Sequence, residues 1–296
     1  GVIIVNTKRG KLGKPTVDVH YEQGFTQPVK LPKFIGSADY LSLMNELSLD
    51  GGGSTIYSPD LIEKYRTNAD PELYPNVDWL DEITKDHATN RRANLTVTGG
   101  SDVLRYALVA SYYGERGIFE RDESQTWDSS TKLNKYNMRS NVDVNITKTT
   151  IARISIGGYL QETNGMIDDG DTRASDFVLD KAFETPPFVH PAIYSSGEIP
   201  KVKNRTNPWA RATQHGFTTY SNAKIESMFS LEQDLKFLLP GLKIKGIFSF
   251  DRYIRSGAVR SKSPDYYYPA TQRNEDGTLD ITIADYGQML DRKSVV

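Results

Sequence analysis

The chain has 296 residues, of which 38% are hydrophobic and 25% charged, and its formal net charge is −2. This length suits one large domain or two ordinary ones, and the balanced charge argues against a nucleic-acid partner, because such domains usually carry a basic excess. The absence of cysteine excludes disulfides and cysteine metal sites. No stretch approaches the roughly 20 apolar residues that a transmembrane helix needs.

Segments in which apolar and polar residues alternate recur along the chain, and this period of two predicts β-strands. In the clearest segment, the even positions Met138, Val142 and Val144 are apolar, whereas the intervening positions Arg139 and Asp143 are charged. In chain order, the predicted strands are 16–22, 94–99, 104–112, 136–146, 151–161, 224–235 and 242–253. An eighth strand is expected within residues 280–286.

The lengths of these strands and of their connections indicate a membrane barrel. The longer strands have about ten to twelve residues, whereas about five or six is usual in soluble proteins and roughly 9–11 span a bilayer. Short links at 99–103, 147–150 and 237–241 alternate with long links that follow Tyr113, Gln161 and Tyr253. Membrane barrels show this alternation, with short periplasmic turns and long outer loops.

The long links contain short predicted helices. Ser37 is a suitable N-cap for a helix over 38–47, and Pro59 can begin a helix at 60–63. Asp171 or Thr172 is expected to cap a further helix that ends before Pro186.

We therefore predict an all-β fold, a partial transmembrane antiparallel β-barrel with about seven to eight long strands. Hydrocarbon offers no partners to backbone groups, so a spanning sheet must close on itself, with apolar residues outward and polar residues toward a lumen. Aromatic residues at strand ends are expected at the membrane interface: Tyr112, Tyr113, Tyr136 and Tyr253. The alternative is a soluble sheet packed on one face, as in a carbohydrate-binding β-sandwich.

Several phrases of the sequence resemble the SusC/RagA-type TonB-linked outer-membrane transporters. Residues 1–10 (GVIIVNTKRG) resemble the strand that closes the plug of this family, and residues 37–45 (SADYLSLMN) are similar to an early helix phrase. The remaining similar phrases are 74–79 (YPNVDW), 94–101 (NLTVTGGS), 136–141 (YNMRSN) and 239–242 (LPGL). All occur in the order found in the family.

The resemblance implies a fragment of a 22-stranded barrel, with residues 1–14 as the end of the plug and residues 15–296 as the first part of the barrel. It further implies a location in the outer membrane of a Gram-negative, Bacteroidetes-type bacterium, in contact with lipid. The implied partners are a SusD-type surface lipoprotein as a lid, TonB acting through a missing N-terminal part, and an oligosaccharide or peptide-like cargo. It implies no enzymatic activity and no cofactor.

Two groups of residues are candidates for contact with ligand, lid or plug. Aromatic side chains on the outer loops can stack on sugars or contact a lid protein, although loop packing explains them equally well: Trp209, Tyr220, Tyr266, Tyr267 and Tyr268. Polar residues of the strands are expected to face the lumen, toward the plug or the cargo path: Arg105, Arg139, Asn141, Asp143, Arg153 and Tyr159. General solvation of the barrel wall is the simpler explanation for this second group.

No metal site and no catalytic site is expected. Asp168, Asp169 and Asp171 form a weak calcium candidate, but their spacing does not match the EF-hand pattern and suits a solvated turn and helix cap. The four histidines are far apart in sequence, and His190, between Val189 and Pro191, suits loop packing. The sequence contains no Gly-x-Ser-x-Gly motif and no Walker-type phosphate loop.

Overall fold

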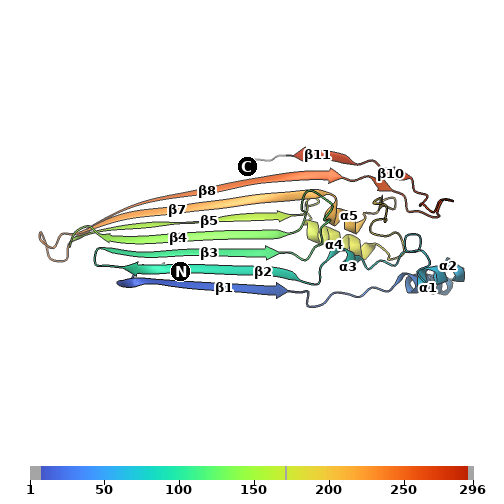
Figure 1. The fold of residues 1–296 in the computed structure, drawn as a ribbon, viewed down its shortest axis with the longest axis horizontal. Helices are drawn as coiled ribbons and strands as arrows, with labels where there is room; N and C mark the ends of the chain where they lie inside the picture. The colour runs from blue at the N-terminus through green and yellow to red at the C-terminus, as the bar shows by residue number, and fades with distance from the viewer. Residues whose placement is uncertain (1–7, 171, 293–296) are drawn as a thin grey trace.

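A computed structural model describes residues 8–170 and 172–292 of the chain. The first part of the predicted plug strand, residues 1–7, and the calcium candidate Asp171 lie outside the described residues. Figure 1 shows two regions: one long sheet that runs along the molecule, and a group of helices gathered at one end of that sheet.

The long sheet is an antiparallel meander in the order β1-β2-β3-β4-β5-β7-β8-β11, which confirms the predicted fold class; the sheet is not closed within this chain. Seven of its eight strands are the predicted ones, and each runs longer than predicted. The strands are β1 Gly13–Thr26, β2 Ala88–Gly100, β3 Leu104–Arg116, β4 Lys132–Asn145, β5 Thr150–Gly165, β7 Gly216–Asp234, β8 Lys243–Ser263 and β11 Gln288–Arg292.

The predicted position of the eighth strand is wrong. Residues 280–286 do not join the long sheet; they contain β10 (Ile283–Asp285), which pairs with β9 (Tyr266–Tyr267) in a small separate sheet. The eighth strand of the long sheet, β11, begins after this segment. Alternation identifies a strand but not the strand with which it pairs, and here the partner is β9, which lies in a long connection and not in the long sheet.

The register of the long sheet gathers the apolar residues on one face, the apolar face. Tyr112 pairs with Tyr136, Tyr136 with Leu160, and Leu160 with Ala223, so these side chains lie in one row across four strands. No second sheet covers this face within the described part of the chain. Val19, for example, is 72% exposed. A β-sandwich needs two sheets packed face to face, so this arrangement speaks against the soluble alternative.

The apolar face has the height of a membrane core. Ile244 and Ile254 bound its apolar stretch on β8, and at about 3.4 Å per residue they are ~34 Å apart along the strand. A strand tilt of about 40° reduces this to ~26 Å, close to the apolar band of outer-membrane barrels. Arg252, one row below Ile254, is a charged residue on this face, and its long side chain can reach the nearby interface.

Two of the four expected interfacial tyrosines lie on the wrong face. Tyr112 and Tyr136 are on the apolar face, with ring centroids 5.2 Å apart. Tyr113 pairs with Lys135, and Tyr253 pairs with Lys224, so both lie on the opposite, polar face. Adjacent residues of a strand point in opposite directions, so closeness to a strand end does not establish which face a ring occupies.

The long connections fold together at one end of the sheet (Figure 1). We call them the loop cap: residues 27–87, 117–131, 166–170, 172–215 and 264–287. Its elements are α1 Ser37–Asp50, α2 Pro59–Arg66, α3 Trp79–Ile83, α4 Ala174–Glu184, α5 Pro208–Thr213, β6 Ile199–Pro200, β9 and β10. A hydrophobic core that includes Trp79, Ile83 and Val178 holds three of these connections together. No helix in the described residues is long and apolar enough to cross a membrane.

Two predicted helix caps are wrong. Gly36 precedes α1 in the N-cap position, and the Ser37 hydroxyl donates instead to the carbonyl of Pro75 at 2.8 Å. The residue before α4 is Arg173, and the first amide of α4 donates to the carboxylate of Asp168 at 2.9 Å. At α1 a long-range contact replaces the expected cap, and at α4 a carboxylate six residues earlier in the same loop replaces it.

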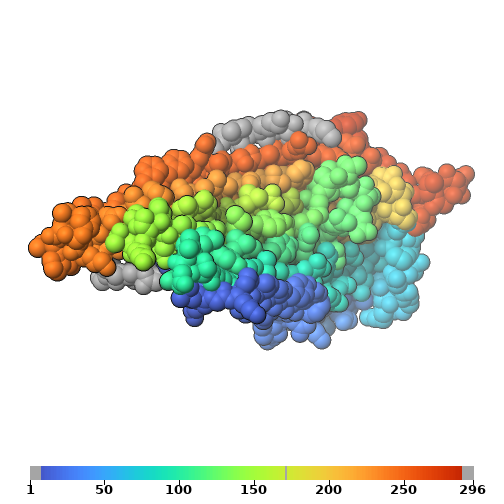
Figure 2. Space-filling view, turned by 60° about the vertical axis from the view of Figure 1, so that its left-hand side comes forward, coloured from blue at the N-terminus to red at the C-terminus, as the bar shows by residue number. Residues whose placement is uncertain are grey.

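The short turns lie at the opposite end of the sheet. The β7–β8 hairpin projects farthest there, and Figure 2 shows it (orange) at the end away from the loop cap. Its turn contains Pro240 and Gly241, and Gly241 has a φ of 86°, a conformation that glycine adopts without strain.

Candidate functional site

The six strand residues predicted to face the lumen all lie on the polar face of the sheet. Arg105 pairs with Asp143, and Asp143 pairs with Arg153, so these three charges form one row across β3, β4 and β5. Asn141, Arg139 and Tyr159 follow on the same face toward the loop cap. The structure therefore brings together residues that are up to 54 positions apart in sequence.

The described end of the predicted plug segment lies on this polar face. The Arg9 guanidinium donates to the Asp143 carboxylate at 2.5 Å. The Asn141 amide donates to the backbone carbonyl of Lys8 at 2.6 Å, and its oxygen accepts from the Ser155 hydroxyl at 2.6 Å. Asn141 is 3% exposed. Two neighbouring rows of the face thus hold residues 8 and 9 against the sheet.

Gly10 continues this contact. A Cβ atom at Gly10 would overlap backbone atoms of Arg105 and Tyr106 on β3. Only glycine allows the segment to lie this close to the strand without displacement. Residues 8–10 are therefore seated on the polar face by side-chain bonds and by close backbone approach.

A second charged row crosses the polar face two rows from the first, on the side of the loop cap. The Arg139 guanidinium passes over Gly157 and donates to Glu226 at 2.9 Å, and Lys224 donates to the other oxygen of Glu226 at 2.6 Å. A Cβ at Gly157 would lie 3.2 Å from the guanidinium carbon, so glycine leaves room for this crossing. Because these side chains are largely exposed, water screens both ion pairs, and their role is to order the side chains more than to stabilise the sheet.

Glu226 and its counterpart Glu232 are missing from the predicted set. Glu232 accepts from Arg153 at 2.7 Å, so both acids neutralise predicted arginines. The alternation of 224–235 places both on the polar side of their strand, but β5 and β7 are joined by a long link. Their partners follow only from the register.

An open cavity of about 410 Å³ lies between the seated segment and these charges. Tyr159 lines it, and the Lys135 ammonium lies 5.1 Å from the Tyr159 ring. The lining offers an aromatic ring, amide groups and charges of both signs: Lys8, Asn137, Arg139, Asn141, Tyr159 and Glu226. The hydrogen-bond donors and acceptors of this surface can bind polar peptide groups or sugar hydroxyls.

The structure does not bring the five candidate aromatic residues together. Tyr220 lies on β7 on the polar face of the sheet, where its ring covers Gly257 and the Arg255 guanidinium lies 5.4 Å from it. Tyr268 is 47% exposed in the loop cap, and Tyr267 lines a cavity of about 560 Å³.

Trp209 and Tyr266 both belong to the small hydrophobic core around Ile199 and Ala210, where they pack against other side chains of the loop cap. Trp209 packs against both hydrophobic clusters of the loop cap, and Tyr266 is 4% exposed. The Tyr266 hydroxyl shares a hydrogen bond with Nε2 of His215 at 2.7 Å. Burial raises the pKa of Tyr266 and lowers the pKa of His215 to about 4, so this pair is neutral at physiological pH.

His190 is part of the loop core, as its sequence context indicates. Its ring lies edge-on to Trp79 with centroids 5.3 Å apart, and its Nδ1–H donates to the Pro191 carbonyl at 2.8 Å. Burial lowers the pKa of His190 to about 4. The ring is therefore neutral and serves packing.

The acidic loop before α4 has structural contacts. Asp168 binds the Ala174 amide, and Asp169 pairs through its backbone with Thr172. Among residues 8–170 and 172–292, no group of three or more metal-ligating side chains is arranged to hold an ion.

An ion-pair cluster joins two distant parts of the loop cap. The Arg273 guanidinium donates to Asp70 at 2.6 Å and to Glu72 at 2.7 Å. The hydrogen bond from Arg273 lowers the pKa of Asp70. The pKa of Glu72 is lowered mainly by the hydrogen bond from the Ser195 amide and to a smaller extent by the bond from Arg273. This cluster connects the β1–β2 link to the β8–β11 link.

The fold defines the class to which the chain can be assigned: a segment of a transmembrane antiparallel β-barrel with its long loops folded at one end.

No protein-family model matches the chain. It is similar to the TonB-dependent receptor P3 of Formosa agariphila, with 26% identity over 223 residues, which cover 72% of this chain and 19% of that protein. The chain thus spans about a fifth of the curated relative that it matches.

Solved structures share the fold. The RagAB peptide transporter superimposes with a TM-score of 0.56 at 14% identity, over 86% of this chain and 30% of that one. The RagAB peptide importer in its closed-closed state gives a TM-score of 0.56 at 15% identity, over 86% and 30% of the two chains. These comparisons confirm the resemblance to SusC/RagA-type TonB-dependent transporters, and the relatives are a receptor and a transporter.

Proposed function

We propose that this chain forms part of a TonB-dependent outer-membrane transporter. In this proposal residues 15–296 belong to the first part of the barrel wall, and residues 1–14 are the end of the plug inside it. The transporter imports oligosaccharide or peptide-like nutrients, takes energy from TonB through its plug, and works with a SusD-type lipoprotein over its mouth.

The observation that carries the proposal is the seat of residues 8–10 on the polar face. A lumen needs a polar wall, and a plug needs contacts with that wall. Arg9 and the Lys8 carbonyl make these contacts with Asp143 and Asn141, while the opposite face of the same strands is apolar. One sheet thus separates a surface suited to lipid from a surface suited to a plug.

The chemistry of the polar face supports the proposed cargo class. Charges of both signs, amides and Tyr159 line the cavity beside the seated segment, which supports a polar, uncharged or zwitterionic cargo. The similar RagAB proteins are described as a peptide transporter and a peptide importer, which supports the peptide-like option. The exposed Tyr268 of the loop cap supports contact with a lid protein or a ligand.

A deletion and complementation experiment tests this function. We expect cells that lack the encoding gene to lose uptake of labelled oligosaccharides or of labelled peptides, and the intact gene to restore it. Restored uptake should stop when a protonophore removes the energy that TonB delivers. Uptake unaffected by the deletion in both cargo classes, together with protein in the soluble fraction, would refute the proposal.

A further inference from the structure

The outward, apolar face becomes polar at one level of the sheet, just beyond the row of Tyr112 and Tyr136. The next row toward the loop cap contains Arg91, Asn134 and Glu162, and the row after that contains Arg116, Lys132 and Asn164. The Tyr112 hydroxyl donates to Asn134 at 3.0 Å. The ring of Tyr112 therefore lies at the apolar edge while its hydroxyl reaches the polar rows.

We call these two rows and their continuation on β7 and β8 the outer belt. Its members share the outward face and the level directly beyond the apolar band: Arg91, Arg116, Lys132, Asn134, Glu162, Asn164, Thr219, Ser221, Ser256 and Ala258. Because the loop cap marks the outer side of a membrane barrel, the outer belt lies at the headgroup level of the outer leaflet.

One half of the outer belt is cationic. Arg91 and Arg116 are exposed, and neither guanidinium has an ion-pair or hydrogen-bond partner among the described residues. Lys132 is paired with Asp128, so the two arginines supply the free positive charge. Glu162 is three strands from Arg91, about 14 Å away, which exceeds the screening length of about 8 Å at physiological salt.

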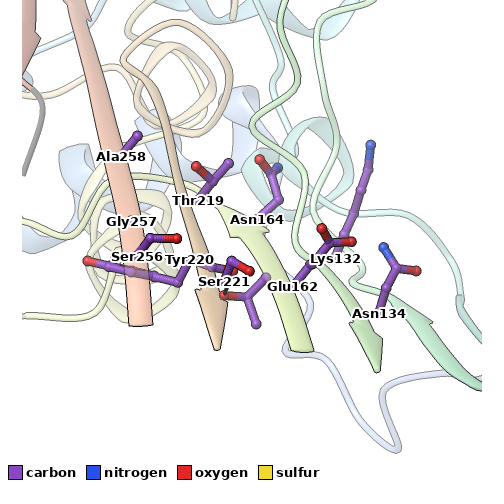
Figure 3. A pocket seen from close by; sticks show the side chains of 11 residues that line it. Lys132, Asn134, Glu162, Asn164, Thr219, Tyr220, Ser221, Ser256, Gly257 and Ala258 are labelled. Atoms are coloured by element: carbon purple, nitrogen blue, oxygen red, sulfur yellow. Dashed lines mark hydrogen bonds between the residues drawn. The ribbon is translucent and has the colours of Figure 1, made fainter. Parts of the chain in front are cut away.

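The other half of the outer belt is a hydroxyl- and amide-rich hollow. Figure 3 shows it between side chains of β4, β5, β7 and β8. Its volume is about 440 Å³, and Asn134, Asn164, Thr219, Ser221 and Ser256 line it together with the charged Lys132 and Glu162. The neutral donors and acceptors and the Glu162 carboxylate can bond sugar hydroxyls, whereas planar guanidinium groups match phosphate oxygens in bidentate pairs.

We infer that the outer belt binds the headgroup of a phosphorylated glycolipid of the outer leaflet. The phosphate lies against Arg91 and Arg116, and the sugars occupy the hollow on β5 to β8. The acyl chains run down the apolar face past Tyr136. This inference rests on the membrane placement in the proposed function, and it adds a lipid ligand on the outside of the wall.

The test uses the full-length transporter, purified in mild detergent and analysed by native mass spectrometry with bisphosphorylated lipid A. We expect the wild-type protein to retain the lipid, and Arg91→Gln/Arg116→Gln to bind it about tenfold more weakly for each arginine lost. Arg92→Gln is the matched control. It changes the neighbouring residue, whose side chain lies on the polar face near Glu22, and should leave binding unchanged.

Two further probes separate lipid from phosphate. Dephosphorylated lipid A should bind as weakly to the wild type as lipid A binds to the double variant, and millimolar inorganic phosphate should not displace lipid A. The conservative Arg91→Lys/Arg116→Lys should bind with intermediate strength, because it keeps charge and loses bidentate geometry. The lysine variant also replaces the glutamine variant in the test if the glutamine variant does not fold, which loss of its heat-modifiable gel shift would reveal.

Equal retention of lipid A by the wild type and the double arginine variants would overturn the inference, as would equal binding of dephosphorylated lipid A. If the variant proteins sit in the outer membrane and transport normally but keep the lipid, only this inference fails. If the wild-type protein is absent from the outer membrane, the proposed function fails first.

Discussion

Removing the two side chains that seat residues 8 and 9 should release this segment from the polar face. The perturbation is Asn141→Ala combined with Asp143→Ala. The Asn141 bond to the Lys8 carbonyl is a neutral hydrogen bond, worth about 1 kcal/mol net. The Arg9–Asp143 pair is partly exposed, at 40% and 19%, and contributes up to about 1 kcal/mol. A total of about 2 kcal/mol corresponds to a roughly 30-fold rise in the released population.

Native-state hydrogen exchange of the peptide that contains residues 8–10, in the intact transporter, measures this population. Asn137→Ala is the control, because Asn137 lies on the same strand and face but binds Ser111, 3.2 Å away, and not the segment. We expect fast exchange in the double variant and unchanged exchange in the control. A rise of less than about threefold, or an equal rise in the control, would refute the assigned seat.

The remaining predictions concern the polar face and the loop cap. Gly157→Leu should displace the Arg139 guanidinium and destabilise the sheet by about 1–3 kcal/mol, which should lower the temperature at which the heat-modifiable gel shift occurs. Gly165→Leu is the control, because a Cβ at Gly165 would have its nearest neighbour 3.9 Å away, and it should leave this temperature unchanged. His190 has a pKa lowered to about 4, so the unfolded chain binds the extra proton and loop-cap stability should fall as the pH drops from 6.5 to 4, by up to about 3 kcal/mol. Hydrogen exchange of the loop core at pH 7 and 4.5 measures this. His215 has a similarly lowered pKa and accounts for part of the dependence, so a dependence of undiminished size in His190→Phe would contradict the prediction. Arg273 lowers the pKa of Asp70, and the Ser195 amide together with Arg273 lowers the pKa of Glu72. The stabilisation from these carboxylates is therefore present above the ordinary carboxyl pKa and is lost as the pH falls through the lowered values. Limited proteolysis below about pH 4 should show the loop cap opening, and in Arg273→Gln cleavage should already be raised at pH 7.

The strands could be predicted because their environment leaves a local pattern. A wall between lipid and water needs side chains of opposite character at alternate positions, and the segments around Met138 and Ile154 show this directly. The lengths of the strands follow from the membrane thickness, and the alternation of short and long links follows from the two sides of the membrane. Each of these constraints acts within one segment of the chain.

The remaining features depend on pairing between distant segments. Glu226 faces Arg139 only because of the register between β5 and β7, which no local pattern encodes. The position of Tyr113 and Tyr253 near strand ends predicts an interfacial location, whereas the register places both on the polar face. The position of Tyr266 in a long link makes it a candidate for binding, but the residue is buried and bonded to His215, because the loop cap forms a core of its own.

The two-faced sheet is the centre of this account, and adjacent residues of β7 test it most directly. These 296 residues contain no cysteine. Single cysteines at positions 228 and 229 can therefore carry spin labels in the full-length protein in outer-membrane vesicles, with any cysteine outside these residues replaced by serine. We predict that the label at 229 is reached by oxygen, which concentrates in lipid, and that the label at 228 is reached by a water-soluble nickel complex. Equal accessibility at both positions, or the reverse pattern, would contradict the account.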